Sequence, residues 1–212
     1  MAESNGNITT ISHPVVDRDL TILRNKHTNT ADFRLAMGRI ATILAYQALK
    51  DLPLKKVEIE TPVTKTSGYQ IDTDIIIVPI LRAGLSLVDA LIDFIPDASV
   101  GHLGMYRDET THTPVDYYSN LPNKLETATV LLVDPMLATG GSADDAINFL
   151  KEKGAANIRF ISLISAPEGL ERITNKYPDV SIITAAVDEK LNSDAFIVPG
   201  LGDAGDRYFG TT

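Results

Sequence analysis

The stretch TVLLVDPMLATGGS, residues 129–142, decides the fold of this chain. Its continuous apolar run, residues 130–133, is typical of a strand buried on both faces of a parallel sheet. Asp134 follows at the carboxyl end of that strand, where open α/β sheets bind their ligands. The turn at residues 139–142 then offers backbone N–H groups and two hydroxyls to a phosphate. An ordinary strand-to-helix turn would need the glycines, but not Asp, Thr and Ser together.

Strand and helix patterns alternate on both sides of this stretch, which predicts right-handed βαβ crossovers and a doubly wound sheet. Strands are expected at residues 74–80, 100–107, 130–133, 157–164 and 180–187, and helices after residue 86 and at residues 143–153 and 167–176. Asp144 and Asp145 lie in the first turn of the helix after the glycines, where they can compete with an anion for the positive end of its dipole.

Two arginines stand at strand ends of this predicted sheet. Arg82 lies in a strand-to-helix turn and Arg107 ends the next strand, so both are placed to pair with phosphate oxygens. Arg82 taken alone is also consistent with a solvated turn residue. The polar segment 108–124 is expected to be a lid, a binding loop or a hairpin arm. Its His112 is a possible base, although an exposed loop histidine is commoner.

The part before the core is expected to contain an extended arm and two helices, at residues 8–14, 17–26 and 30–49. Thr30 or Asp32 is the expected cap of the second helix. Residues 57–70 alternate between apolar and polar side chains, which predicts a peripheral hairpin with its turn at Ser67 and Gly68. Arg24 is a candidate to contact a ligand, but it is interpreted as a surface charge.

The tail FIVPGLGDAGDRYFGTT, residues 196–212, contains four glycines and a proline, which predicts a shaped loop rather than a helix or strand. Its apolar side chains favour a folded flap over the strand ends. Asp203 and Asp206 are candidates to hold a cation or to bind hydroxyls.

Composition narrows the class of protein. A chain of 212 residues with 44% hydrophobic and 22% charged residues is typical of one α/β domain with an appendage. Its formal net charge of -9 argues against nucleic-acid binding through a basic surface. It has no cysteine for disulfide or thiolate chemistry, no apolar segment near the ~20 residues of a membrane span, and a polar start unlike a secretory signal. We therefore expect a cytoplasmic protein without a membrane partner.

The opening stretch resembles the ribose-phosphate loop of type I phosphoribosyltransferases. Three further stretches narrow the resemblance: VPILRAGLS at residues 78–86, GMYRDE at 104–109 and IVPGLGDAGDRYFGT at 197–211. Together the four resemble the uracil phosphoribosyltransferases, from about Asp17 to the C-terminus. The resemblance implies the type I phosphoribosyltransferase fold, an α/β fold with a central, mostly parallel sheet flanked by helices. It also implies one domain over residues 1–212, with the arm and first helices in 1–69, the core at about 70–187 and a small hood at 188–212.

The implied reaction converts uracil and 5-phosphoribosyl 1-diphosphate (PRPP) to UMP and diphosphate, a step of pyrimidine salvage. Mg²⁺ is implied as a complex with PRPP, without direct protein ligands. The residues implied to bind PRPP are Arg82, Arg107, Asp134, Pro135, Met136, Leu137, Ala138, Thr139, Gly140, Gly141, Ser142 and Asp203. Those implied to bind uracil are Ile197, Gly202, Asp203 and Ala204. Arg82, Arg107, Asp134 and Asp203 are the residues expected to be catalytic. Asp134 precedes Pro135, where the wider superfamily commonly has two adjacent acidic residues; the uracil enzymes share this departure.

Two other functions stay open at this point: a phosphoribosyltransferase for a different base, and a non-catalytic, nucleotide-sensing RNA regulator with the same fold. The resemblance also implies at least a homodimer, and in several family members activation by GTP. The N-terminal arm and the hairpin at residues 57–70 are the candidate interfaces.

Overall fold

The computed structural model describes residues 2–107 and 114–211, and a central sheet organises them. The strands of this sheet are β1 (Ala2–Asn5), β2 (Ile8–Ile11), β5 (Ile75–Pro79), β6 (Ser99–Val100), β9 (Thr129–Val133), β10 (Met136–Leu137), β11 (Asn157–Ser165) and β12 (Ser181–Val187). Their order is β1-β2-β12-β11-β9-β5-β6, with β10 alongside β11. All neighbours are parallel except β1 and β2. The expected extended arm is thus present as β2, which joins the edge of the sheet.

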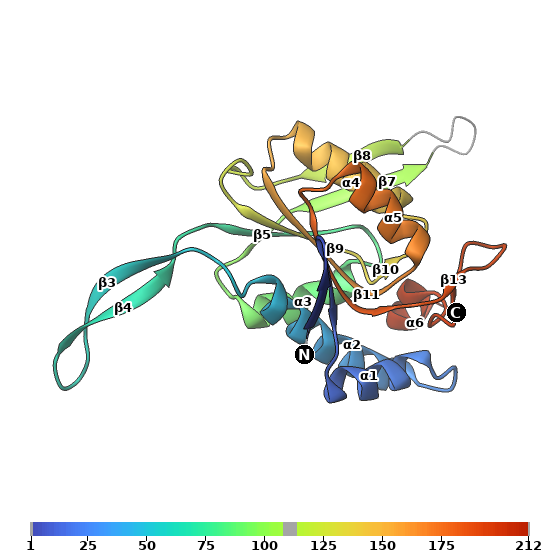
Figure 1. Cartoon of the computed structure of the whole chain (residues 1–212), viewed down its shortest axis with the longest axis horizontal. Coiled ribbons are helices and arrows are strands. Elements are labelled where there is room, and N and C mark those ends of the chain that lie inside the picture. Colours follow the sequence, from blue (N-terminus) through green and yellow to red (C-terminus); the bar gives the residue numbers. More distant parts are fainter. Residues whose placement is uncertain (1, 108–113, 212) are drawn as a thin grey trace.

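Helices cover both faces of the sheet (Figure 1). One face carries α1 (Pro14–Arg24), α2 (Thr30–Ala48) and α3 (Leu85–Phe94), and the other carries α4 (Gly141–Glu152) and α5 (Pro167–Lys176). In β9, Leu131 and Val133 pack toward the first group, whereas Val130 and Leu132 pack toward the second. Each such fully buried side chain contributes about 1.5–3 kcal/mol. The prediction of a mostly parallel α/β sheet flanked by helices is confirmed.

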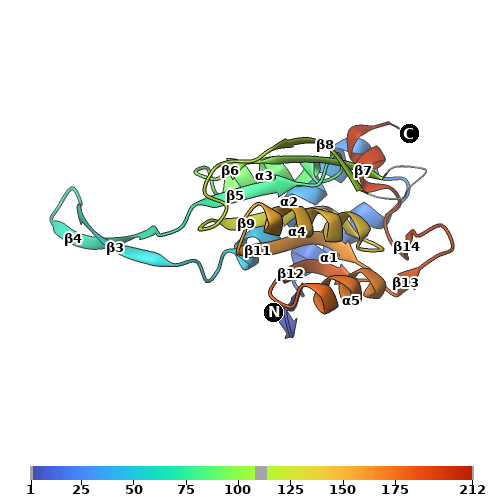
Figure 2. The same ribbon diagram turned by 90° about the horizontal axis from the view of Figure 1, so that it is seen from above.

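Two hairpins and the tail lie outside the sheet. The hairpins are β3 (Leu54–Glu60) with β4 (Lys65–Ile71), and β7 (His102–Arg107) with β8 (Pro114–Asn120). The tail contains β13 (Lys190–Leu191), β14 (Ile197–Val198) and α6 (Ala204–Phe209). The β3–β4 hairpin projects far from the body in both views (Figures 1 and 2). Within the described residues, no helix has both the length and the apolar character needed to span a membrane.

The peripheral hairpin is confirmed, but its predicted turn is wrong. Ser67 and Gly68 lie inside β4 and pair with residues of β3, and the Ile59 side chain of β3 lies over Gly68. The chain reverses at residues 61–64 instead, because the Thr61 hydroxyl accepts the N–H groups of Val63 and Thr64.

The strand predicted at residues 100–107 is two strands. A side chain at Gly101 would lie 2.8 Å from Leu121 Cδ2, so the backbone is closely covered there and changes direction. The β6 strand stays in the sheet, while β7 leaves it to pair with β8. Of the three options for the polar segment, residues 114–120 form a hairpin arm. Residues 108–113, with His112, lie outside the described part of the chain.

Two further predictions of local structure, a helix cap and the loop in the tail, are wrong. Asn29 caps α2 rather than Thr30 or Asp32, because its side-chain oxygen accepts the Asp32 N–H at 2.9 Å. The tail, predicted to be a loop without helix or strand, contains both: β14 lies within it, and Asp203 caps α6 by accepting the Asp206 N–H at 2.8 Å. The glycines around this short helix are typical of a loop, which is why the sequence pattern did not predict it.

Candidate active site

A break in strand pairing brings Asp134 to the carboxyl edge of the sheet. The Asp134 N–H donates to Ile161 O at 3.1 Å, so pairing with β11 continues one residue past β9. Pro135 has no N–H and interrupts the ladder, while its carbonyl accepts from Leu163 and Ile164 at 3.0 and 3.2 Å. Pairing resumes at β10. The carboxylate therefore stands at a fixed kink between two paired segments.

The residues after β10 form a loop that opens α4. We call residues 134–142 the phosphate loop. Gly140 has φ of 75°, a left-handed conformation that favours glycine, and helix α4 begins at Gly141. Thr139 and Ser142 are exposed, whereas the two glycines between them are buried. The hydroxyls and the positive end of the α4 dipole thus face solvent together, as anion binding requires.

Helix α5 supports this loop from behind. A Cβ on Gly169 would lie 2.4 Å from the Ala138 carbonyl oxygen, and a Cβ on Gly140 would lie 3.2 Å from the Gly169 oxygen. Only glycines allow this close approach of helix and loop. The position of the phosphate loop is therefore set by backbone contact with α5.

Asp144 does not compete for the anion site, contrary to the expectation from sequence. Its buried carboxylate accepts hydrogen bonds from Arg172 at 2.6 Å, Lys176 at 2.6 Å and Tyr177 at 2.8 Å. Burial alone would raise the pKa of Asp144, but the bonds from Lys176, Tyr177 and Arg172 hold it below its usual range. Two cations thus neutralise this carboxylate. We call these four residues the Asp144 clamp.

The phosphate loop and the tail together enclose a cavity of about 220 Å³. Its lining residues are Ala83, Asp134, Met136, Ala138, Ala195, Phe196, Ile197, Gly202, Asp203, Ala204 and Gly205. Pockets for drug-sized ligands begin near about 300 Å³, so this volume suits one small ring. All four residues expected to bind uracil lie in this lining, beside Asp134. Ala83, Ala195, Phe196 and Gly205 were not predicted, although each neighbours a motif residue or lies in the tail.

The charge state of Asp134 depends on this enclosure. Its side chain keeps partial access to solvent through the cavity, yet protein surrounds it and burial raises its pKa to about 7. The nearby negative charge of Asp203 raises the pKa further, whereas a long 3.5 Å bond from the Met136 N–H opposes the shift. Among the described residues that line the cavity, Asp134 and Asp203 are the only charged ones, so the cavity favours a positively charged group on its ligand.

The two predicted arginines differ in what can be described. Arg82 lies between β5 and α3 with its side chain 69% exposed, and its Nη2 is 3.9 Å from Asp206 Oδ1. Such an exposed pair contributes little, so Arg82 can reorient toward a ligand. Arg107 is the last residue of β7, and its side chain lies outside the described part.

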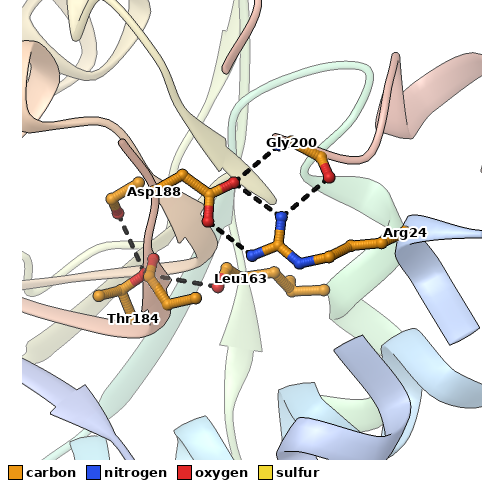
Figure 3. Close-up of polar contacts among 7 residues, drawn as sticks. Arg24, Leu163, Thr184, Asp188 and Gly200 are labelled. Carbon is orange, nitrogen blue, oxygen red and sulfur yellow. Dashed lines mark hydrogen bonds and ion pairs between the residues drawn. The ribbon is translucent and has the colours of Figure 1, made fainter. Parts of the chain in front are cut away.

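Arg24, interpreted from sequence as a surface charge, is instead half-buried and paired. It donates to both carboxylate oxygens of Asp188 and to the Gly200 carbonyl in the tail (Figure 3). No local signal could have revealed this pair, because its members lie 164 positions apart.

Comparison with known proteins identifies the family and the fold of this chain. The family model for uracil phosphoribosyltransferase matches residues 10–211. The chain is 51% identical over 205 residues to the uracil phosphoribosyltransferase of Salinibacter ruber, covering 97% of this chain and 98% of that protein. A solved structure of an Aquifex aeolicus protein is 37% identical with a TM-score of 0.90, over 97% and 99% of the two chains. The adenine phosphoribosyltransferase of Leishmania donovani, 13% identical, shares the fold with a TM-score of 0.61 over 92% and 90%. The chain belongs to the uracil phosphoribosyltransferase family.

Proposed function

We propose that this chain transfers the phosphoribosyl group of PRPP to N1 of uracil, giving UMP and diphosphate in pyrimidine salvage. The observation that carries the proposal is the cavity that joins Asp134 to the tail residues Ile197, Gly202, Asp203 and Ala204, directly beside the phosphate loop. A phosphate site, a carboxylate for a sugar and a pocket for a small ring then follow one another along one edge of the sheet.

The phosphate loop binds the ribose phosphate part of PRPP. The Thr139 and Ser142 hydroxyls and the N–H groups at the start of α4 bind the 5'-phosphate. Asp134 accepts hydrogen bonds from the ribose hydroxyls, while the loop backbone between these residues follows the sugar. Contacts to both the 5'-phosphate and the hydroxyls hold the ribose ring in place while its anomeric carbon reacts.

The leaving diphosphate is stabilised by charge. N1 of uracil attacks the anomeric carbon as the bond to diphosphate breaks, and the N1 proton passes to the departing diphosphate or to water. The sugar acquires oxocarbenium character, so no protein nucleophile is needed. Arg82 and Arg107 pair with the departing oxygens, where negative charge develops. Asp203, at the cavity, lies near both the diphosphate and the base.

Mg²⁺ fits this site as a partner of PRPP. The described residues contain no group of three or more side chains suited to a metal ion. Two carboxylates, Asp134 and Asp203, nevertheless face one cavity, and Mg²⁺ typically combines one or two carboxylates with substrate phosphates and water. Asp203 would hold the ion through its waters. The bound ion supplies Lewis-acid neutralisation of the diphosphate.

Uracil selection rests on the tail. Ile197 and Ala204 are buried apolar walls of the cavity. Backbone groups of residues 202–204 can pair with the imide edge of uracil, and the amino group of cytosine would then leave a donor facing a donor. Such a mismatch can cost a factor of about 10⁴ in specificity.

The direct test measures UMP formation from labelled uracil, PRPP and Mg²⁺, with cytosine, orotate and hypoxanthine as competitors. We expect that, of the four bases, only uracil gives a nucleotide product. No product in the presence of Mg²⁺ contradicts the proposal, and product with a purine or orotate identifies a different base. An RNA titration at physiological salt tests the regulator alternative, for which tight binding without turnover is the positive result.

Single variants test the two arginines. Arg82→Ala and Arg107→Ala should each lower kcat/KM by about 100-fold at subsaturating PRPP, because each removes charge stabilisation from the leaving group. Unchanged efficiency in either variant removes that arginine from the mechanism.

We also infer a homo-oligomer, activation by GTP and a cytoplasmic setting from the family resemblance. The β3–β4 hairpin supports the oligomer, since an isolated two-stranded hairpin is marginally stable in water and this one exposes apolar side chains. Activity assays with and without GTP test activation.

A further inference from the structure

The tail is tied to the body by a buried ion pair that is not part of the cavity. Asp188 directly follows β12 and is 7% exposed, and its N–H donates to Ser165 O at 2.8 Å. Arg24, at the end of α1, donates from Nη1 to Asp188 Oδ2 at 2.8 Å and from Nη2 to Oδ1 at 2.6 Å (Figure 3). This two-pronged pair is geometrically specific, because a planar guanidinium matches both carboxylate oxygens at once.

Both members of the pair hold one residue of the tail. The Gly200 N–H donates to Asp188 Oδ2 at 2.8 Å, and the Gly200 carbonyl accepts from Arg24 Nη1 at 2.9 Å. Gly200 has φ of +63°, and a Cβ there would lie 2.1 Å from Ile197 O. The backbone is therefore tightly folded between Ile197 and Gly202, two residues that line the cavity.

Arg207 makes a second tie between the same parts. Its Nη1 donates to Leu201 O at 2.8 Å and to Leu23 O, and its Nη2 donates to Asn25 O at 2.7 Å. Its guanidinium also lies 4.4 Å from the centre of the Phe33 ring. Two arginines thus join the end of α1 to the tail: Arg24 of α1 donates to the tail, and Arg207 of the tail donates to backbone carbonyls at the end of α1.

We propose that Arg24 and Asp188 are positioning residues for the base, which set how far the tail wall of the cavity stands from Asp134. The proposal rests on the proposed function. Neither residue lines the cavity, and both reach it through the backbone of Gly200. The phosphate loop has separate support from α5, through Gly169 and the Asp144 clamp. Loss of the ion pair should therefore disturb uracil binding more than PRPP binding.

Another ion pair provides a matched control. Arg39 on α2 donates to Asp19 on α1 at 2.7 and 2.9 Å, and Asp19 is fully buried. Like Arg24 with Asp188, this is a two-pronged Arg–Asp pair, but it joins α1 to α2 rather than to the tail, and Asp19 also accepts a hydrogen bond from Arg18 at 2.9 Å. Arg39→Ala therefore breaks a two-pronged Arg–Asp pair that has no direct link to the base site, while Arg18 still neutralises Asp19.

The experiment compares Arg24→Ala, Arg24→Lys and Asp188→Asn with Arg39→Ala in steady-state assays that vary uracil and PRPP separately. We expect Arg24→Ala to raise KM for uracil about tenfold or more, since a shift of about 1 Å in a binding site can cost up to 100-fold. KM for PRPP should stay near the wild-type value. Arg24→Lys, which keeps the charge but loses the fork, should restore part of the affinity for uracil. Arg39→Ala should lower Tm without separating the two KM values.

Equal changes in both KM values, or a uracil effect in Arg39→Ala as large as in Arg24→Ala, would overturn the proposal. If Arg24→Ala does not fold, Arg24→Lys and Asp188→Asn answer the same question, and wild-type KM for uracil in both would also overturn it. A wild-type protein that forms no UMP refutes the proposed function instead, so the two failures are distinguishable.

Discussion

Asp134 is a carboxylate whose place in the fold disfavours its own charge. It lies at the kink between β9 and β10, where burial, followed by the nearby Asp203, raises its pKa from 3.8 to about 7. The folded protein therefore keeps a proton that the unfolded chain releases near pH 4. As pH rises from about 4 to about 7, this difference progressively lowers the stability of the ligand-free fold.

Asp134→Asn should stabilise the ligand-free protein while impairing its reaction. At pH 8 we expect a gain on the order of 2 kcal/mol in the free energy of unfolding, and a smaller gain at pH 5, because the wild-type side chain is largely neutral there. Denaturant titrations at the two pH values measure the gain. Equal gains at both would contradict the assigned pKa, and wild-type kcat/KM for PRPP would remove Asp134 from the ribose site.

Gly169 is a second residue whose identity is dictated by its surroundings. A Cβ at this position would lie 2.4 Å from Ala138 O and 3.0 Å from Leu137 Cγ, so Gly169→Ala must displace the phosphate loop. We expect KM for PRPP to rise about tenfold with a smaller change for uracil. Gly38→Ala is the control: Gly38 lies in α2, and a Cβ there would meet no described neighbouring atom within 4 Å, so this variant should gain about 0.5–1 kcal/mol. Unchanged PRPP kinetics in Gly169→Ala would refute the role of α5 as a support.

At the scale of elements, the Asp144 clamp joins α4 to α5. Asp144→Asn should cost about 1–3 kcal/mol at pH 7, because it weakens the hydrogen bonds that three side chains donate to a buried carboxylate. The folded-state pKa of Asp144 is below 3.8, so the stabilisation is complete above about pH 4 and is lost as pH falls through that lower value. The difference between variant and wild type should therefore shrink in acid.

Asp179, 55% exposed in its pair with Lys151, is the control, since solvent screening limits the cost of Asp179→Asn to under about 1 kcal/mol. An equal cost in both variants, or one independent of pH, would contradict the clamp.

The elements that the sequence predicts well are those whose pattern is local. Buried runs such as residues 130–133 identify the parallel strands, and the phosphate-loop and tail motifs name residues that do meet at one cavity. Errors arise where a distant residue decides the local structure. Leu121 and Pro122 cover Gly101 and divide one predicted strand, and Asp188 converts Arg24 from a surface charge into an anchor. Neither contact can be predicted from the periodicity of apolar and polar residues in the sequence.

At the scale of the whole molecule, the β3–β4 hairpin stands apart from the rest of the described chain. It extends away from the sheet and the helices in both views (Figures 1 and 2). Its exposed apolar side chains are Leu54, Ile59, Val63, Tyr69 and Ile71, with 42–92% of their surface accessible. Exposed apolar side chains on so thin an element indicate that another protein surface covers the hairpin. A second copy of the chain is the partner that the family resemblance implies.

We therefore predict that the protein is at least a dimer, with twice the 23.0 kDa mass of one chain. The double variant Leu54→Lys with Tyr69→Lys should weaken association at least tenfold, because each lysine puts a charge into an apolar contact. Sedimentation equilibrium over a range of concentrations measures the shift toward monomer. Leu35→Lys is the control, since Leu35 is 60% exposed on α2 and not on the hairpin. A wild-type monomer at every concentration refutes the dimer, whereas dissociation by Leu35→Lys but not by the hairpin variant places the contact on α2 instead.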